Sequence, residues 1–253
     1  MERLRRRDFL TLVSGAALSA VPRTGRTYRS PNRILYFIQA AGYRHDVLPI
    51  SQAVFEQLGR DTGLFDVATT EDASTFTTAN LERYSAVCFF TSGELLVSDA
   101  QKAALLGFVR SGGGFVGIHS AAATFSFWPD YLDLIGGRFN GHPWHQLVTI
   151  EVTDPDDPLV GVFGRAFEIE DEIYQIGDFD YKGSRVLLRL DSLSVDLSAS
   201  GVQRRPYGWP LAWTRMYGDG RVFYSALGHE AGVWRDPRYQ QILTNAIRWT
   251  ARW

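Results

Sequence analysis

The sequence has little sulfur and lacks several short motifs that mark common catalytic folds. Its single cysteine, Cys88, excludes an internal disulfide, and its apolar neighbours indicate a core residue rather than a nucleophile. The patterns G-x-x-x-x-G-K-S/T and G-x-S-x-G are absent. The glycine run at 112–114 precedes a predicted strand, opposite to the strand–glycine–helix order that cradles phosphate. These features argue against a P-loop nucleotide-binding protein and against an α/β-hydrolase.

Basic charge is scarce beyond the N-terminus. The chain has 26 basic and 28 acidic residues, of which five arginines and two acids fall in the first 25 positions. The remainder therefore carries 21 basic and 26 acidic residues, and this mildly acidic balance argues against a nucleic-acid partner. No later apolar run approaches the length of a membrane span, so we expect no stable span after removal of a signal segment.

The N-terminus contains a targeting pattern. Residues 6–10, RRDFL, match the twin-arginine pattern R-R-x-F-L and are followed by a weakly apolar stretch at 10–21. We predict a twin-arginine signal segment at 1–25, a linker at 26–32 and an exported domain at 33–253, located in the periplasm or at the cell surface. A basic amphipathic helix on a cytosolic protein and an uncleaved anchor are the alternatives.

Strands and helices alternate through the first half of this domain. Apolar runs predict buried strands at 33–40, 65–70, 84–90 and 115–118. Helical spacing and an N-cap serine predict intervening helices at 46–59 and 98–112. This order is typical of an α/β fold, with a doubly wound, mainly parallel sheet and helices on both faces.

After residue 125 the pattern changes to that of an antiparallel extension. Its predicted strands are 147–152, 167–175, 185–190 and 211–215. A further buried strand at 220–227 and a helix at 237–253 complete the domain.

Three of the five histidines follow predicted strands of the sheet. His45 comes after the loop that follows the first strand, and His119 and His229 come at the ends of two later strands. Open α/β sheets bind ligands where the carboxyl ends of their strands meet, so we expect these three imidazoles in one pocket. Each histidine alone would be interpreted as a hydrogen-bonded loop residue. The occurrence of all five histidines near glycines, which permit close approach of the backbone, favours a shared site.

A run of acids supplies the carboxylates for such a site. Strand alternation would point Glu170, Glu172 and Tyr174 to one side and Asp171 and Gln175 to the other. Adjacent carboxylates repel one another, so at least one set needs hydrogen-bond donors, a cation or water, unless the segment is a solvated turn. The catalytic candidates are therefore His45, His119, Asp171, Glu172 and His229.

Polar and aromatic residues near these groups are candidates for substrate binding. Aromatic rings would stack on a flat ligand or a sugar ring, and the polar groups would hydrogen-bond to it. The candidates are Tyr43, Arg44, Ser92, Gly93, Glu94, Ser120, Trp144, Tyr174, Gln175, Glu230 and Trp234.

Two further histidines have a spacing found in metal sites. His142 and His145 could bind a divalent metal such as zinc, although Pro143 between them disfavours a regular helix. A pair with this spacing needs a third ligand, such as His119, His229 or an acid, before it forms a site.

Five segments together carry a resemblance to a known family: GFVGIHS at 114–120, GRF with GHP at 137–143, DEIY at 171–174, PLAW at 210–213 and GRVFY with GHE at 220–230. With them, the chain from about residue 33 to 253 resembles the ThuA-like (trehalose utilisation) family. The resemblance implies the flavodoxin-like fold of class I glutamine amidotransferases. In those enzymes a nucleophilic cysteine occupies a sharp turn where this sequence has His119, so amidotransferase activity is not expected.

The resemblance also implies a role in sugar metabolism, because members of the family accompany oxidoreductases that make 3-keto sugars. On this basis His119 or His229 would remove a proton beside a sugar carbonyl, while Asp171 or Glu172 orients a histidine or acts as the acid. The result would be isomerisation or β-elimination of a sugar or 3-keto-glycoside. The rings expected to stack on the sugar are those of Tyr43, Trp144, Tyr174 and Trp234.

Two other functions are compatible with the same sequence. One is a non-catalytic periplasmic sugar-binding or accessory protein, and the other is a metal-assisted hydrolase. The partner in each case is a small-molecule carbohydrate, and the sequence leaves open whether the chain forms a homo-oligomer.

Overall fold

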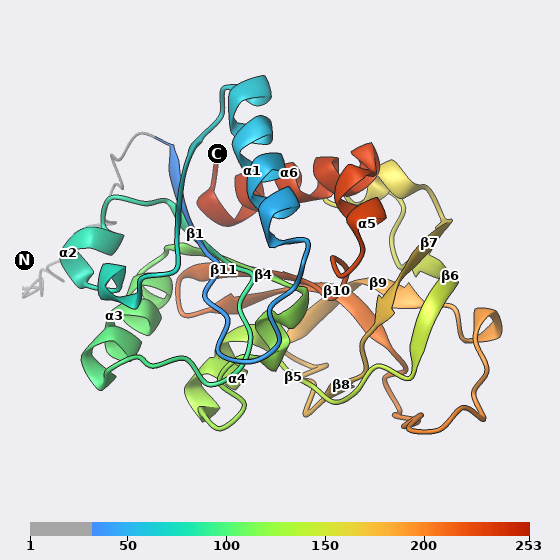
Figure 1. The fold of residues 1–253 in the computed structure, drawn as a ribbon. Coiled ribbons are helices and arrows are strands. Elements are labelled where there is room, and N and C mark those ends of the chain that lie inside the picture. The colour runs from blue at the N-terminus through green and yellow to red at the C-terminus, as the bar shows by residue number, and fades with distance from the viewer. Residues whose placement is uncertain (1–31) are drawn as a thin grey trace, which may run out of the picture.

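The computed structural model describes residues 32–253 of the chain (Figure 1). The predicted twin-arginine segment and all but the last residue of the predicted linker lie outside these residues. Within the described range, no helix is both long enough and apolar enough to cross a membrane.

A nine-stranded sheet crosses the molecule in the order β2-β1-β3-β4-β11-β10-β9-β6-β7. Its first five strands pair in parallel: β1 (Arg33–Phe37), β2 (Asp66–Thr70), β3 (Ala86–Phe89), β4 (Gly114–Ile118) and β11 (Gly220–Ser225). Every residue of β3 and β4 is buried, which explains why these segments read as continuous apolar runs without polar alternation.

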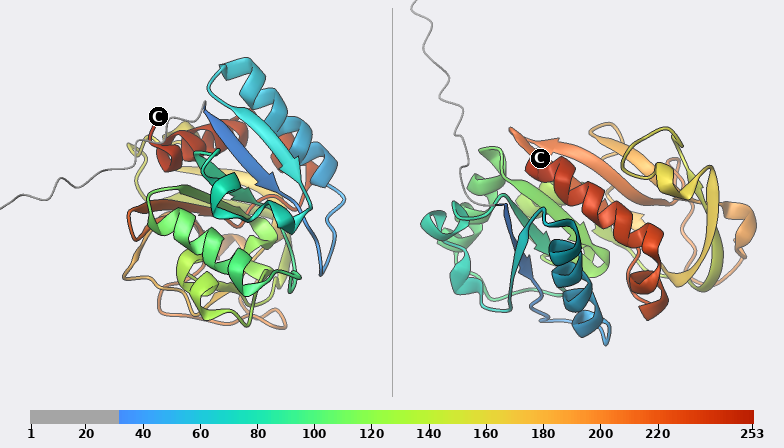
Figure 2. Two further views of the ribbon diagram at one scale, coloured as in Figure 1. Left: turned by 90° about the vertical axis from the view of Figure 1, so that its left-hand side faces the viewer. Right: turned by 90° about the horizontal axis from the view of Figure 1, so that it is seen from above.

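Helices cover both faces of the parallel strands (Figures 1 and 2). One face carries α1 (Leu48–Thr62), α5 (Ala231–Arg235) and α6 (Pro237–Ala251). The other carries α2 (Thr78–Leu81), α3 (Asp99–Arg110) and α4 (Pro129–Ile135). Ser98 begins α3 with a capping box, because its hydroxyl accepts the Gln101 N–H while the Gln101 side chain accepts the Ser98 N–H.

The remaining four strands of the large sheet are antiparallel. They are β10 (Pro210–Tyr217), β9 (Ser184–Leu190), β6 (Trp144–Val152) and β7 (Ala166–Ile173). A separate antiparallel pair consists of β5 (Arg138–Phe139) and β8 (Ile176–Gly177). Figure 2 shows this antiparallel region curving away from the parallel strands at one end of the molecule.

The predicted fold class is confirmed: the sheet has a parallel, doubly wound part and an antiparallel extension. The sequence prediction missed the short helices α2, α4 and α5 and the two-residue strands β5 and β8. Elements this short contain too few residues to show a helical or strand period.

Phe115, the second residue of β4, tests how much the core of the parallel sheet contributes to stability. Its side chain is completely buried and its ring packs 5.1 Å from that of Phe89. We expect Phe115→Ala to lower the free energy of unfolding by about 3–5 kcal/mol, measured by chemical denaturation. The matched control is Leu96→Ala, at a side chain that is 92% exposed, where the change should stay within about 0.5 kcal/mol.

Candidate functional site

His45, His119 and His229 meet at the carboxyl edge of the parallel strands. His45 lies in the loop after β1, His119 begins a 3-10 helix directly after β4, and His229 follows β11. The ring centroid of His45 lies 4.9 Å from that of His119 and 5.1 Å from that of His229, and the last two are 5.4 Å apart. The structure thus brings together the three histidines that the strand ends had predicted to converge.

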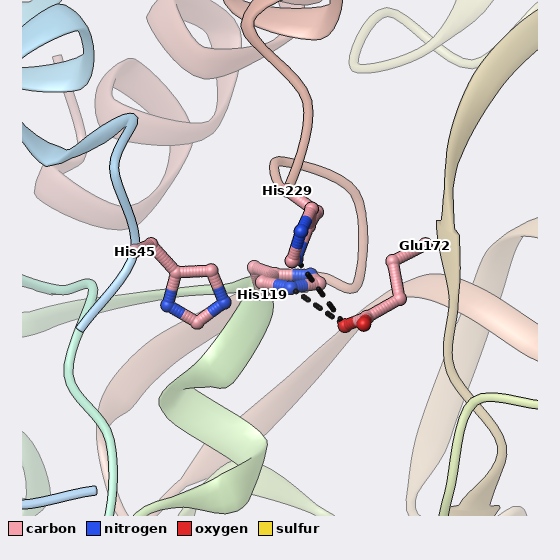
Figure 3. Close-up of side chains that lie close together, drawn as sticks. All are labelled: His45, His119, Glu172 and His229. Atoms are coloured by element: carbon pink, nitrogen blue, oxygen red, sulfur yellow. Dashed lines mark ion pairs between the residues drawn. The ribbon is translucent and has the colours of Figure 1, made fainter. Parts of the chain in front are cut away.

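Glu172, near the end of β7, supplies a carboxylate to this group (Figure 3). Its Oε2 atom lies 3.4 Å from His119 Nε2 and 3.4 Å from His229 Nδ1. We call His45, His119, Glu172 and His229 the four-residue cluster. One nitrogen of each histidine and one oxygen of Glu172 all lie within 4.8 Å of one another.

The conformation of His119 is fixed by two hydrogen bonds, one to its ring and one to its backbone carbonyl. It has a φ of +45°, in the left-handed region that non-glycine residues rarely adopt. Its ring Nδ1 lies 2.6 Å from the carbonyl oxygen of Ala226, and its own carbonyl accepts the Tyr224 hydroxyl at 2.7 Å. Because a carbonyl can only accept, Nδ1 must carry a proton, and in the neutral form of the ring Nε2 then presents a lone pair to the cluster.

The cluster shifts the acid–base properties of its members in opposite directions. Burial is the main cause that lowers the pKa of His45 to about 3, and the neighbouring imidazoles His119 and His229 lower it further. Burial alone would raise the pKa of Glu172, but its contacts with His119 and His229 outweigh this and lower it. The same carboxylate raises the pKa of His229. At neutral pH, His45 is therefore neutral and Glu172 is ionised.

His142 and His145 do not face a common point. His142 Nδ1 lies 3.2 Å from Oε1 of Glu172, the oxygen that does not contact His119 or His229. His145, on β6, instead places its Nε2 2.8 Å from Oε1 of Glu230. The two-histidine spacing was thus misleading as a metal pair, because the residues between them carry the chain from a loop into a strand.

The cluster borders a pocket of about 510 Å³, within the size range of small-molecule sites. Of the residues predicted to bind substrate, five line it: Tyr43, Ser92, Gly93, Ser120 and Tyr174. The lining also contains Gly42, Ala123, Phe139 and His142. Sequence reasoning did not select Gly42, Ala123 or Phe139 for the site, although GRF at 137–139 was part of the family resemblance.

The loops that form one wall approach each other closely. Gly93 has a φ of +78°, and a Cβ atom added there would lie 2.4 Å from the backbone nitrogen of Gly42. The Ser92 hydroxyl donates a hydrogen bond to the Tyr43 carbonyl at 2.6 Å, which fixes the loop that carries His45. Glycine at position 93 is therefore required both by the backbone conformation and by the contact.

Asp171 supports the cluster without lining the pocket, a placement that fits the first of its two predicted roles, orienting a histidine, better than the second, acting as the acid. The side chain is completely buried and accepts hydrogen bonds from the backbone N–H groups of Gly228 and Glu230, at 2.8 and 2.9 Å. Burial raises its pKa, while His119 and the backbone N–H groups act in the opposite direction. Because His229 lies between Gly228 and Glu230, Asp171 positions the loop that presents this imidazole.

Three charged candidates for substrate binding, Arg44, Glu94 and Glu230, lie outside the pocket lining. Arg44 makes a two-pronged ion pair with Glu71, with N–O distances of 2.9 and 2.7 Å. Glu94 is exposed and does not line the cavity. Glu230 also lies outside the lining and is paired with His145.

Three buried candidates prove to be structural. Their polar groups are already used within the protein: the Trp144 indole donates to the Asp196 carbonyl, the Gln175 amide donates to the Gly201 carbonyl, and the Trp234 indole donates to the Gly228 carbonyl. Trp234 also stacks on Phe90, with ring centroids 5.7 Å apart. All three side chains are buried and lie outside the pocket lining, so the two tryptophan rings are not placed to stack on a ligand there.

Comparisons with known proteins show the family and agree with the fold. The profile of the ThuA family, described as trehalose utilisation, matches residues 33–250. A ThuA-like protein from Bacteroides uniformis has 24% identity and a TM-score of 0.74, over 88% of this chain and 92% of the other. A second, from Parabacteroides merdae, has 20% identity and a TM-score of 0.68, over 88% and 90%. No curated protein matches the chain in sequence.

A more distant fold similarity links the chain to part of a larger enzyme. It matches a β-galactosidase from Rahnella with 14% identity and a TM-score of 0.55, over 88% of this chain but 31% of the enzyme. At this identity the similarity concerns the fold alone.

Replacement of Asp171 tests its positioning role. Asp171→Ala leaves the N–H groups of Gly228 and Glu230 without their acceptor, so we expect the free energy of unfolding to fall by about 2 kcal/mol. Chemical denaturation measures the change. Glu170→Ala is the matched control, because the adjacent side chain is exposed and its removal should change stability by less than about 0.5 kcal/mol. Equal stability of the two variants would contradict the assignment.

Proposed function

Because the chain belongs to the ThuA (trehalose utilisation) family, which indicates a sugar-related role, we propose that it is an enzyme that acts on a sugar or a 3-keto-glycoside. The observation that carries this proposal is the four-residue cluster, of which His45, His229 and Glu172 line one pocket while His119 is buried behind them. Three histidines with a shared carboxylate exceed what binding of a neutral sugar requires, and they match the groups that move protons and stabilise charge.

The lining favours an unphosphorylated sugar. The aromatic side chains of Tyr43, Phe139 and Tyr174 offer ring faces on which a pyranose can stack. Among the described residues, the lining includes no lysine or arginine, the residues that most often bind phosphate. Arg44 lies in sequence between the lining residues Tyr43 and His45, but its guanidinium group forms two hydrogen bonds to Glu71.

His142 is the group best placed to transfer the proton. Its Nδ1 faces the ionised carboxylate of Glu172, so this nitrogen carries the ring proton and Nε2 is free to act as a base. The free nitrogens of His119 and His229 lie against Glu172 instead. We therefore assign the base role, which the sequence had suggested for His119 or His229, to His142.

The proposed reaction begins with a 3-keto sugar. His142 takes a proton from the carbon beside the carbonyl, and the electrons of that C–H bond form an enolate whose oxygen faces the imidazoles of the cluster. If the deprotonated carbon carries a hydroxyl group, transfer of that hydroxyl proton to the enolate oxygen and return of the first proton to the former carbonyl carbon move the carbonyl by one position and isomerise the sugar. Expulsion of the oxygen substituent at the β position instead splits the glycosidic bond, and the leaving oxygen takes up a proton.

The test is turnover of 3-keto-glycosides by the full chain, with products identified by NMR in D₂O. Deuterium should appear at the carbon beside the carbonyl, and His142→Gln should lower kcat by about 10²–10⁴-fold because the base is lost. His145→Gln is the matched control and should stay near the wild-type rate. Full turnover by His142→Gln would show that another group is the base. Sugar binding without any turnover would favour the non-catalytic alternative.

The aromatic wall gives an independent prediction. Phe139 lies 4.5 Å from Tyr174 between ring centroids and lines the cavity. We expect Phe139→Ala to raise KM about three- to tenfold with a smaller effect on kcat, because stacking energy is lost equally in the ground and transition states. Steady-state kinetics on the same keto-glycoside would measure this split, and a loss confined to kcat would contradict a binding role.

A further inference from the structure

The four-residue cluster contains two buried nitrogens without hydrogen-bond partners. They are Nε2 of His119, whose side chain is fully buried, and Nδ1 of His229. A polar atom enclosed in this way costs free energy unless something binds to it. Both nitrogens lie 3.4 Å from Oε2 of Glu172, which exceeds the usual length of an N–H···O hydrogen bond of about 2.7–3.2 Å.

We propose that His45, His119, His229 and Glu172 bind one divalent transition-metal ion at the floor of the pocket, with zinc as the best match to this donor set. Bonds of about 2.0–2.2 Å place neighbouring ligands of a tetrahedral zinc ion about 3.3–3.6 Å apart. The two separations of 3.4 Å at Glu172 have this length. Three nitrogens and one carboxylate oxygen also favour zinc over magnesium or calcium, which prefer oxygen ligands.

The contacts around the cluster prepare these groups as ligands. The Ala226 carbonyl holds the proton of His119 on Nδ1, so Nε2 offers its lone pair, the arrangement common for metal-bound histidines. Glu172 divides its two oxygens, with Oε2 toward the imidazoles and Oε1 toward His142 Nδ1. Asp171 fixes the loop of His229 through Gly228 and Glu230.

A second group of possible ligands is less suited to the ion. His145, His229 and Glu230 also lie close together, but His145 and Glu230 are already paired at 2.8 Å. Their side chains are 45% and 41% exposed, so water and the mutual ion pair satisfy them without a metal. In the four-residue cluster, by contrast, His119 Nε2 is buried away from water and has no hydrogen-bond partner.

The proposed ion deepens the proposed function and rests on it for its catalytic meaning. A divalent cation at the floor of the pocket would take the carbonyl oxygen of the keto sugar as a fifth ligand and stabilise the enolate charge. His142, outside the ligand set, would still move the proton. Glu172 would then link the two tasks, one oxygen serving the cation and the other orienting the base.

Metal titration tests this site without any substrate. The full chain is freed of metal with a chelator and titrated with Zn²⁺ by calorimetry, and with Co²⁺ by its visible absorption. We expect one ion per chain and a Co²⁺ spectrum typical of nitrogen ligands. Glu172→Gln and His119→Ala should each weaken Zn²⁺ binding by at least about 100-fold, because a ligand contributes more than the groups that orient it.

His145→Ala is the matched control and should retain Zn²⁺ affinity within about threefold. Circular dichroism of each metal-free variant shows whether it is folded, and Glu172→Gln, at the pocket surface, keeps the test decisive if His119→Ala does not fold. Failure of the wild-type chain to bind Zn²⁺ or Co²⁺, or wild-type affinity in Glu172→Gln, would overturn the proposal. Loss of the ion in His145→Ala would place it at the other group. Turnover of the keto-glycoside is measured in a separate experiment, so the metal site and the proposed enzymatic activity can be rejected independently of each other.

Discussion

The contacts of Glu172 with His119 and His229 join the two parts of the sheet into one site. The histidines follow β4 and β11 of the parallel part, whereas Glu172 lies on β7, at the opposite edge of the antiparallel extension. Three strands separate β7 from β11 in the sheet, so the extension must curl back for these side chains to touch. The twist and coiling of β-sheets provide this curvature, and helix α5 contacts β7 where the two parts meet. The parallel part without its extension would therefore lack the carboxylate.

Periodicity in the sequence explains why the parallel half could be predicted. β3 and β4 are continuous apolar runs, which is typical of buried parallel strands. Since the carboxyl ends of parallel strands meet at one edge of a sheet, His45, His119 and His229 could be placed at that edge. The antiparallel half was predicted strand by strand, but pairing order across it depends on distant contacts that no local pattern records. Strand alternation therefore placed Glu172 and Asp171 on opposite faces without identifying which face meets the histidines. Only the structure separates them, with Glu172 in the pocket and Asp171 on the backbone of the 228–230 loop.

The turn after β4 shows how one backbone geometry can serve different chemistry. His119 adopts a positive φ there, at the turn where the resemblance drawn from the sequence would place an amidotransferase nucleophile. Such a conformation persists only where its surroundings hold it, and here the Tyr224 hydroxyl and the Ala226 carbonyl fix both the peptide unit and the ring. A thiol at this turn would act as a nucleophile, whereas a neutral imidazole held in this way presents a lone pair. The positive φ at this turn is therefore compatible with a ligand-binding residue as well as with a covalent nucleophile.

The similarity to part of a β-galactosidase concerns the fold alone, so the chemistry of this pocket has to be argued from its own lining. Most glycosidases need two carboxyl groups on opposite sides of the glycosidic bond, one as acid and one as base or nucleophile. Within the described pocket lining, Glu172 is the single carboxylate, because Asp171 is bound to backbone N–H groups and Glu230 is paired with His145. β-Elimination from a keto sugar avoids this requirement, since the carbonyl makes the neighbouring C–H acidic and one base suffices. If this pocket splits a glycosidic bond, the geometry therefore favours elimination after oxidation of the sugar.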